Sequence, residues 1–239
     1  MLKINNPSAF NQYFRDLKDK LNRKLFNKYT MPWMKTKELD IIIEVVVNLK
    51  PEYVLEWGSG YSTLLFPPEM PQLKKWISVE HNADWYKIIN EGIDSNKVDL
   101  KLIEPNNLEF DKKGKNFEAR REGLLEDFKE YVAYPGTLGQ KFDFIFIDGR
   151  ARRHCLLEAA SMLSEQGVLI VHDANRESYF EEIPSFKNVF HLQDYRKRRQ
   201  LGGIWVGTNR ESWSGLLRTE LHKKAWSTHD VIAKILFLK

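Results

Sequence analysis

Apolar residues recur along this chain with two different periods, and the change from one to the other predicts the order of the elements. Near the N-terminus they return every three or four residues, which indicates an amphipathic helix between Lys3 and Lys28 and a second helix from Thr36 to Leu49. Further along, short runs rich in branched and aromatic residues indicate strands separated by helix-length segments. Strands that alternate with helices favour a parallel sheet, so an α/β fold is predicted.

Seven strands are predicted, at residues 53–57, 76–80, 98–103, 142–147, 168–172, 188–193 and 203–207. The fourth is almost wholly apolar, as expected for a central strand that is buried on both faces. The last two lack a helix-length connection and should pair as an antiparallel hairpin at one edge of the sheet. The long connection from Pro105 to Lys141 has a helical pattern near Phe117 to Tyr131 and is predicted to form part of an acceptor site or lid.

The same patterns divide the chain into three parts. Residues 1–50 are predicted to be a helical lid or flank, residues 51–209 the α/β core, and residues 210–239 an extension of two short helices used for packing or for contact in a homodimer. The chain has 239 residues, of which 42% are hydrophobic, and can therefore bury one sizeable core.

Composition narrows the functional classes. No stretch reaches the roughly 18 apolar residues that a membrane-spanning helix needs, and the first residues lack an apolar signal segment, so no membrane insertion and a cytoplasmic location are expected. The single cysteine, Cys155, excludes a disulfide within one chain. The net charge of +4 is modest, so nucleic acid is not the expected partner. Two arginine clusters, Arg150 to Arg153 and Arg196 to Arg199, keep a nucleic-acid-directed enzyme or binder as an alternative.

A glycine-rich turn follows directly on the first strand of the core, in the segment Glu56-Trp57-Gly58-Ser59-Gly60-Tyr61-Ser62. Glycines at 58 and 60 allow the backbone to approach a ligand closely. Glu56 can meet the ammonium group of an amino-acid-bearing cofactor, and Glu80, at the end of the next strand, can bind two ribose hydroxyls. A carboxylate at position 56 would repel a diphosphate, so the segment favours a cationic cofactor over a nicotinamide dinucleotide.

Acidic residues also follow the fourth and fifth strands. Asp148 and the pair His172-Asp173 come just after strand ends, where open parallel sheets have their sites. A carboxylate or an imidazole in that position can take the proton of an acceptor hydroxyl. Asp148, Asp173 and Asn175 could instead hold a divalent metal ion, although paired carboxylates also occur without one, and the metal is not the favoured alternative.

With these motifs, the region from Leu39 to Thr208 resembles the class I S-adenosylmethionine-dependent methyltransferases, with Glu56 to Ser62 as the first motif and Ser78-Val79-Glu80-His81 as the second. The resemblance implies a Rossmann-like three-layer sandwich, in which a seven-stranded and mostly parallel sheet has its last strand inserted antiparallel. It also implies S-adenosylmethionine as cofactor, lying over the carboxyl ends of the first strands. The cofactor-binding residues that it implies, or that lie beside them, are Glu56, Trp57, Gly58, Ser59, Gly60, Ser62, Glu80, His81 and Asp148.

The segment Asp148-Gly149-Arg150, followed by His172-Asp173 and then Arg176, is distantly similar to sugar and polysaccharide O-methyltransferases, among them the plant glucuronoxylan 4-O-methyltransferases. The chain departs from the plant pattern at Gly149 to Ala151, so the plant substrate is not carried over. Arg150 and Arg176 are candidate substrate-binding residues, because guanidinium groups suit an anionic sugar or phosphate.

The sequence therefore predicts an O-methyltransferase that acts on a hydroxyl of a sugar, a glycan or another small polar acceptor, with Asp173, His172 and Asp148 as catalytic residues. Trp33, Trp57 and Trp85 could line a sugar or adenine surface or could serve only packing, and Trp57, inside the glycine turn, is the best ligand-lining candidate. A catalytically silent, cofactor-binding partner subunit is the remaining alternative.

Overall fold

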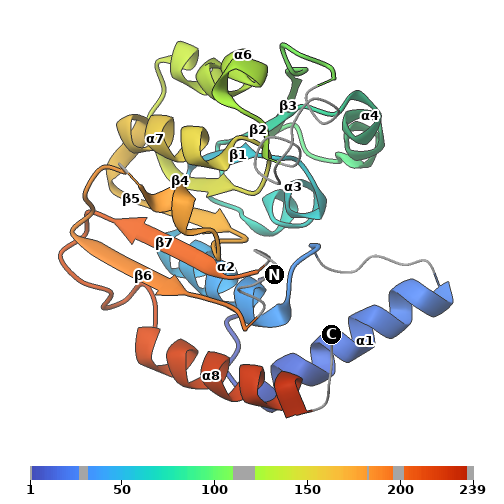
Figure 1. The fold of residues 1–239 in the computed structure, drawn as a ribbon, viewed down its shortest axis with the longest axis vertical. Helices are drawn as coiled ribbons and strands as arrows, with labels where there is room; N and C mark the ends of the chain where they lie inside the picture. Colours follow the sequence, from blue (N-terminus) through green and yellow to red (C-terminus); the bar gives the residue numbers. More distant parts are fainter. Residues whose placement is uncertain (1, 27–31, 110–121, 182, 196–201, 236–239) are drawn as a thin grey trace.

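The computed structural model describes residues 2–26, 32–109, 122–181, 183–195 and 202–235, and its centre is one seven-stranded sheet (Figure 1). The strand order is β3-β2-β1-β4-β5-β7-β6. The strands are β1 (Tyr53–Trp57), β2 (Lys75–Glu80), β3 (Val98–Leu102), β4 (Phe142–Ile147), β5 (Leu163–His172), β6 (Asn188–Leu192) and β7 (Ile204–Thr208). β1 to β5 pair in parallel, and β7 is antiparallel to both β5 and β6. The predicted sheet with its inserted antiparallel last strand is confirmed.

The helices are α1 (Ala9–Phe26), α2 (Thr36–Leu49), α3 (Tyr61–Leu65), α4 (Ala83–Gly92), α6 (Lys129–Ala133), α7 (Arg152–Met162) and α8 (Thr219–Ile235). The prediction of two short C-terminal helices is wrong for the described residues, because no glycine or proline interrupts the helical pattern between Thr219 and Ile235. The helix predicted near residues 117–131 begins outside the described residues. Its described part is a 3₁₀ turn, η3 (Leu125–Asp127), followed by α6, and Gly123 before it has a φ of 81°.

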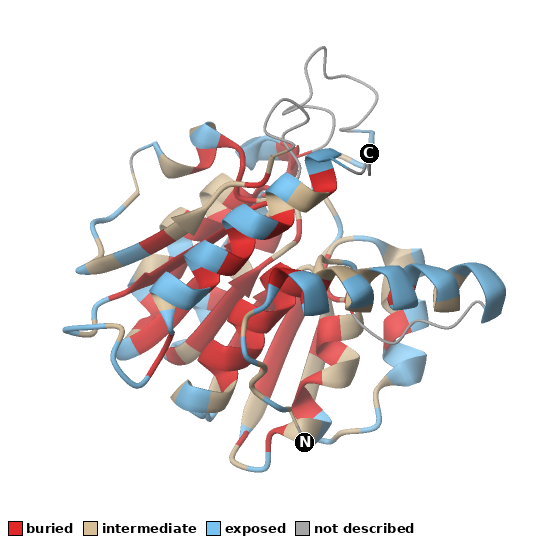
Figure 2. Cartoon of the chain, turned by 90° about the horizontal axis from the view of Figure 1, so that it is seen from below, coloured by how far each residue is buried: buried red, intermediate tan, exposed pale blue. Residues whose placement is uncertain are grey.

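Side-chain alternation along the strands creates two cores, one on each face of the sheet. Val54, Phe144 and Ile170 pack with α2 and α8 in the first core. Their sequence neighbours Leu55, Ile145 and Leu169 pack with α6 and α7 in the second. Figure 2 shows the sheet as the most deeply buried part of the chain, between these helices. Helices on both faces of the sheet make the predicted three-layer sandwich.

The two N-terminal helices differ in their packing. Ile41, Ile42 and Val45 of α2 are fully buried, so α2 packs on the sheet as part of the first core. Within α1, by contrast, only Ala9, Gln12 and Asp19 are buried. In the part of the chain that the structure describes, no helix has both the length and the apolar character needed to cross a membrane.

A buried carboxylate on α2 fixes the start of α8. Glu44 accepts hydrogen bonds from the Arg218 backbone and guanidinium, at 2.7–3.1 Å, and lies 3.1 Å from His222 Nε2. Burial alone would raise the pKa of Glu44, but the hydrogen bonds from His222 and Arg218 outweigh it and lower this pKa to about 2. The C-terminal helix is therefore held to the core by charge as well as by apolar contact.

Glu44→Gln should lower the free energy of unfolding at neutral pH by about 1–3 kcal/mol, because Arg218 and His222 lose a charged acceptor. The contribution of Glu44 is present above its ordinary pKa of 4.5 and is lost as the pH falls toward 2, so the variant should lack this part of the acid-side slope. Urea unfolding between pH 2 and 7 measures both effects. Identical slopes for the two proteins would contradict the assignment.

Candidate active site

A cavity of about 370 Å³ opens at the carboxyl ends of β1, β2, β4 and β5, a volume typical of small-molecule sites. The parallel register pairs Trp57 with Ile147 and Ile147 with Val171, so the residues that follow these strands meet at one edge of the sheet. The cavity is lined by Pro32, Trp33, Gly58, Ser59, Gly60, Tyr61, Ser62, Glu80, His81, Asn82, Trp85, Asp148, Gly149, Arg150, Arg152, His172 and Asp173. Most of the predicted site residues are therefore brought together.

Two glycine turns touch at the floor of this cavity. Gly58 has a φ of +91°, and a Cβ added to it would lie 2.5 Å from Gly149 Cα. A Cβ on Gly149 would in turn lie 2.1 Å from the Tyr131 hydroxyl oxygen. The Gly58 amide donates to Val79 O, and the Asp148 amide donates to Trp57 O, both at 2.9 Å. No other residue type fits at positions 58 and 149 without moving the backbone.

Glu80 is a buried carboxylate at the rim of the turn. One oxygen accepts from the Ser59 amide at 3.0 Å and the Ser59 hydroxyl at 2.9 Å, and the other accepts from the His81 and Asn82 amides at 2.8 Å. Burial would raise the pKa of Glu80, but contact with His81 and these amide donors lower it, so the group is charged at neutral pH. The Ser59 hydroxyl can rotate away, which leaves an acceptor for ligand hydroxyls. The residues present fit a nucleoside held by its ribose.

Two of the predicted cofactor contacts lie elsewhere. Glu56 is fully buried under α3, where it accepts hydrogen bonds from Ser62, Thr63, Trp76 and Ser78. Burial raises the pKa of Glu56 to about 7 in spite of these donors, so it is not the exposed anion that an ammonium group needs.

Trp57 points to the opposite face of the sheet, where its indole N–H donates to Tyr131 O at 3.1 Å. Neither Glu56 nor Trp57 lines the cavity. Successive strand residues face opposite sides, which places both side chains beneath helices and not at the strand end.

His172 lies between two carboxylates at the back of the cavity. Its Nδ1 is 2.8 Å from Asp148 Oδ1, and its Nε2 is 3.2 Å from Glu38 Oε2. Burial would lower the pKa of His172, but the charges of Asp148 and Glu38 raise it well above its ordinary value. With both ring nitrogens engaged and the ring protonated, His172 is poorly suited to accept another proton. The prediction that His172 acts as the base is not favoured by this geometry.

Arg152 is the second buried cation of the site. Its guanidinium donates to the backbone carbonyls of Gly149, His172 and Asp148 at 2.8–3.2 Å. It also lies 3.3 Å from Asp148 Oδ1 and 3.4 Å from Asp173 Oδ2, and so bridges the two predicted catalytic carboxylates.

Asp173, at the end of β5, is the second carboxylate that contacts Arg152. Burial would raise its pKa, but the charges of His172 and Arg152, together with the Gly202 amide that donates to Asp173 at 2.5 Å, hold it far below its ordinary value. A carboxylate with so low a pKa gains little by taking a proton near neutral pH.

The predicted donor set does not fit a divalent metal ion. The Arg152 guanidinium stands between Asp148 and Asp173, where a second cation would be repelled. Asn175 is buried away from the cavity, and its side chain bonds the Asp194 backbone at 2.7 and 3.3 Å. Within the described ranges, no three His, Cys, Asp or Glu side chains are arranged to hold a metal.

The arginines that were predicted to bind substrate or nucleic acid lie in different surroundings. Arg150 lines the cavity, as expected of a substrate-binding residue. Arg176 is buried and contacts Glu122 and Tyr179, so its predicted role in binding substrate is not supported. Arg153 pairs with Glu181 at 3.4 Å, and the cluster Arg196 to Arg199 lies outside the described residues.

Three aromatic side chains, Trp33, Tyr61 and Trp85, form one wall of the cavity. The rings of Trp33, Tyr61 and Trp85 lie 5.4–6.4 Å apart between centroids. The Trp85 indole N–H donates to Ser59 O at 2.8 Å and so connects this wall to the glycine turn. Trp33 lines the cavity and remains largely exposed.

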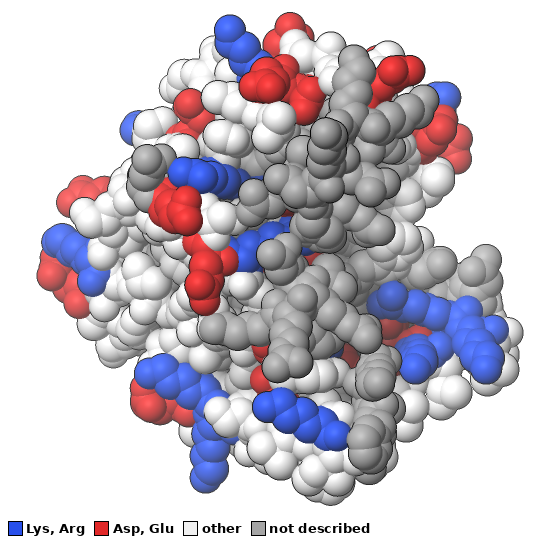
Figure 3. Space-filling model, viewed as in Figure 1, with Lys and Arg blue, Asp and Glu red and all other residues white. Residues whose placement is uncertain are grey.

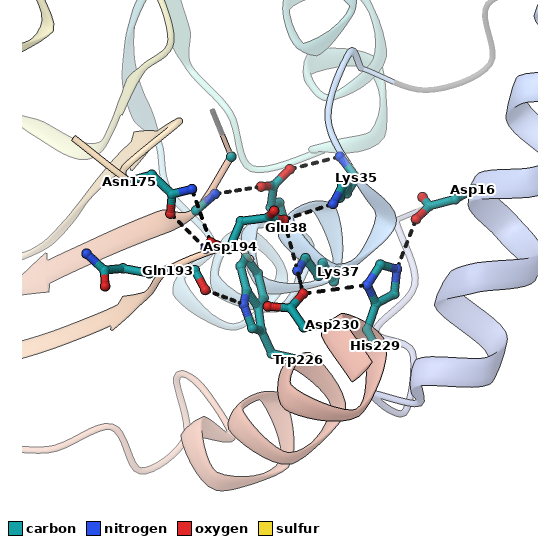
Figure 4. Close-up of polar contacts among 12 residues, drawn as sticks. Asp16, Lys35, Lys37, Glu38, Asn175, Gln193, Asp194, Trp226, His229 and Asp230 are labelled. Atoms are coloured by element: carbon teal, nitrogen blue, oxygen red, sulfur yellow. Dashed lines mark hydrogen bonds and ion pairs between the residues drawn. The ribbon is translucent and has the colours of Figure 1, made fainter. Parts of the chain in front are cut away.

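Glu38 is a site residue that sequence analysis did not identify. Its two oxygens accept from the Lys35 amide at 2.9 Å and the Gly203 amide at 3.0 Å while it holds His172. Figure 4 shows Glu38 beside Lys35 at the start of α2, next to the buried cation Lys37, which binds Asp194 and Asp230. The signal in the sequence was a carboxylate in the first turn of a helix, which ordinarily indicates only capping.

Comparison with known proteins gives a match to a family described as a methyltransferase domain, over residues 55–174. None of the curated proteins matches the chain. A structure from Staphylococcus aureus, provisionally described as a caffeoyl-CoA O-methyltransferase, is similar with a TM-score of 0.53 and 17% identity, over 82% of this chain and 98% of that one. A cofactor-bound protein from MTB is similar with a TM-score of 0.50 and 15% identity, over 88% and 100%. These likenesses show a shared fold.

Gly58→Ala should lower the free energy of unfolding by about 2 kcal/mol or more, because the new methyl group meets the Gly149 backbone at a φ that disfavours alanine. Affinity for S-adenosylhomocysteine, measured by calorimetry, should fall by about ten-fold or more as the turn shifts. Gly136→Ala is the matched control, since no atom lies within 4 Å of its added Cβ. Unchanged affinity in Gly58→Ala would show that the turn does not hold the nucleoside.

Proposed function

This chain belongs to the family of methyltransferase domains and uses S-adenosylmethionine as methyl donor, and we propose that it methylates a hydroxyl of a sugar, a glycan or another small polar acceptor. The observation that carries the proposal is the single cavity in which the glycine turn and Glu80 lie beside Asp148. One end of that cavity suits a nucleoside and the other holds a carboxylate, as transfer of a group to a hydroxyl requires.

When bound, S-adenosylmethionine supplies an electrophilic methyl group. The backbone of Gly58 to Gly60 and the side chain of Ser62 would hold the amino-acid part, and Glu80 the ribose, with His81 beside the base. Because the two glycine turns are fixed against each other, these groups need little rearrangement on binding.

Asp148 is the proposed base. The Asp148 carboxylate would take the proton that the acceptor hydroxyl loses when its oxygen receives the methyl group, while the methyl carbon–sulfur bond breaks and S-adenosylhomocysteine leaves. The Asp148 side chain is 27% exposed, compared with 6% for His172, so Asp148 is the more accessible group. His172, clamped between Asp148 and Glu38, is a positioning residue that fixes the orientation of the carboxylate. Asp173 accepts from the Gly202 amide and lies 3.4 Å from Arg152, so its charge helps to hold that guanidinium in place.

The walls of the cavity support a polar acceptor with an apolar face. Trp33, Tyr61 and Trp85 offer ring faces of the kind on which the C–H face of a sugar packs. Arg150 also lines the cavity, and its guanidinium has the forked geometry that suits a carboxylate or a sulfate on the same acceptor. Together these features favour an acidic sugar over a simple alcohol.

The proposed function is tested with purified protein, S-adenosylmethionine and a panel of neutral sugars, uronic-acid oligosaccharides and catechol. Release of S-adenosylhomocysteine that depends on a sugar, and is faster with the uronic acids, is the expected result. Turnover with catechol but with none of the sugars would show that the acceptor is a phenol and not a sugar. Cofactor binding without turnover on any acceptor would favour the silent partner subunit.

Asp148→Asn should lower kcat by about 100-fold or more, because the amide cannot take the proton. Affinity for S-adenosylhomocysteine should change by less than about three-fold, since the substitution keeps the shape of the side chain. Asp143→Asn is the control, because Asp143 lies at the other end of β4, where it accepts hydrogen bonds from the Glu52 and Tyr53 amides. Equal turnover of Asp148→Asn and the unmodified protein would remove Asp148 from the mechanism.

Removal of divalent metal should leave the reaction unaffected. Since Arg152 occupies the space between the two carboxylates, kcat in excess EDTA should stay within about two-fold of its value with added magnesium. The same assay after extensive dialysis provides the control for chelator inhibition. If turnover were lost in EDTA and restored by magnesium, a metal ion would have to bind between the two carboxylates in place of the Arg152 guanidinium.

A further inference from the structure

Helix α1 is packed with its polar side toward the protein and its apolar side toward solvent. Gln12 and Arg15 bond Asp40 at 3.0 and 2.7 Å, and Asp16 accepts from the Thr36 amide at 2.7 Å. The opposite side carries an apolar row, here named the α1 stripe, whose exposed fractions are Phe10 67%, Phe14 58%, Leu17 40%, Leu21 47% and Leu25 66%. Figure 2 shows α1 as a largely exposed helix that extends beyond the rest of the protein.

Such an arrangement is the reverse of that of an ordinary surface helix, which packs its apolar face on the core. The members of the α1 stripe recur at steps of three or four residues, so they form one continuous face along the helix. A continuous apolar face of this length is a mark of an interaction surface and not of scattered exposure.

The charged residues beside the α1 stripe are mainly basic, which favours an anionic partner. Lys18, Lys20 and Lys24 are exposed, and they lie on both sides of the stripe along the helix. The two acids of α1 face away from solvent: Asp19 is buried and ion-paired with Arg23, and Asp16 faces Thr36 and His229. Figure 3 shows Lys and Arg side chains gathered over the projecting end of α1.

We propose that α1 docks on the surface of an anionic lipid bilayer. The α1 stripe would enter the boundary between headgroups and acyl chains, and the flanking lysines would extend toward acidic headgroups. Juxtaposed lysines add electrostatic attraction to such a surface, which is screened by salt. A symmetric pairing of two copies through this face would instead bring Lys18, Lys20 and Lys24 of each copy close together.

Docking through α1 would also orient the candidate active site. Pro32 and Trp33 line the cavity, and Arg23 of α1 borders a second hollow that contains Glu38, His172 and Asp173. A bilayer bound along the α1 stripe would lie on the opposite side of α1 from this hollow, so docking would hold the site at the membrane surface. The inference about α1 does not depend on the proposed reaction, and it can be tested without turnover.

The experiment is flotation of the full chain with vesicles of phosphatidylcholine alone and with about one-third phosphatidylglycerol, at low and high salt. Binding to the anionic vesicles that weakens by about ten-fold or more at high salt is the expected result. The double variant Leu17→Asp, Leu21→Asp should lose at least about ten-fold in partitioning. Because both side chains are exposed, its thermal midpoint should match that of the unmodified protein.

The matched control is Ile88→Asp with Leu138→Asp, which makes the same two changes at exposed apolar positions of other elements and should bind as the unmodified chain does. No binding to anionic vesicles, or equal binding by the stripe variant and this control, would overturn the proposal. The proposal would also be overturned if the unmodified chain sedimented as a dimer without lipid and the stripe variant sedimented as a monomer.

Discussion

The candidate site depends on the buried Arg152 guanidinium. Glu38, Asp148 and Asp173 gather at one end of the sheet, and three carboxylates so close would repel one another without nearby positive charge. Arg152 supplies that charge while bonding three backbone carbonyls, so it also fixes the turn after β4 to the end of β5. His172 supplies the second cation, between Asp148 and Glu38. The result is a charged wall of fixed geometry, built from side chains of α2, α7 and the ends of β4 and β5.

The topology of the sheet places the proposed nucleoside site beside this charged wall. Parallel strands end at the same edge, and register places the residue after β1 beside the residue after β4, and that one beside the end of β5. Gly58 and Gly149 allow the two turns to touch, which brings the cofactor side of the cavity close to Asp148. Transfer between two bound groups gains from such prearranged proximity.

The strands could be predicted because hydrophobic alternation marks each of them locally. The insertion of the antiparallel last strand followed only from the resemblance to the methyltransferases. The cavity could also be predicted, since strand ends in parallel sheets collect functional residues. The predicted directions of two side chains were wrong. Glu56 and Trp57 lie within β1, and because successive strand residues point to opposite faces of the sheet, both side chains lie beneath helices. Ion pairs between residues distant in sequence were missed as well. The residues around Arg176 do not indicate that Glu122 is its partner, and those around His172 do not indicate Glu38. The i,i+4 spacing of Asp148 and Arg152 was the one local signal of the charged wall.

A crystal structure of the protein with S-adenosylhomocysteine tests the central claim most directly. The account predicts the nucleoside against residues 58–60, its ribose hydroxyls on the Glu80 carboxylate and its sulfur directed toward Asp148, with Arg152 still between Asp148 and Asp173. A nucleoside bound elsewhere on the chain, or bound in the cavity with its sulfur directed away from Asp148, would contradict it.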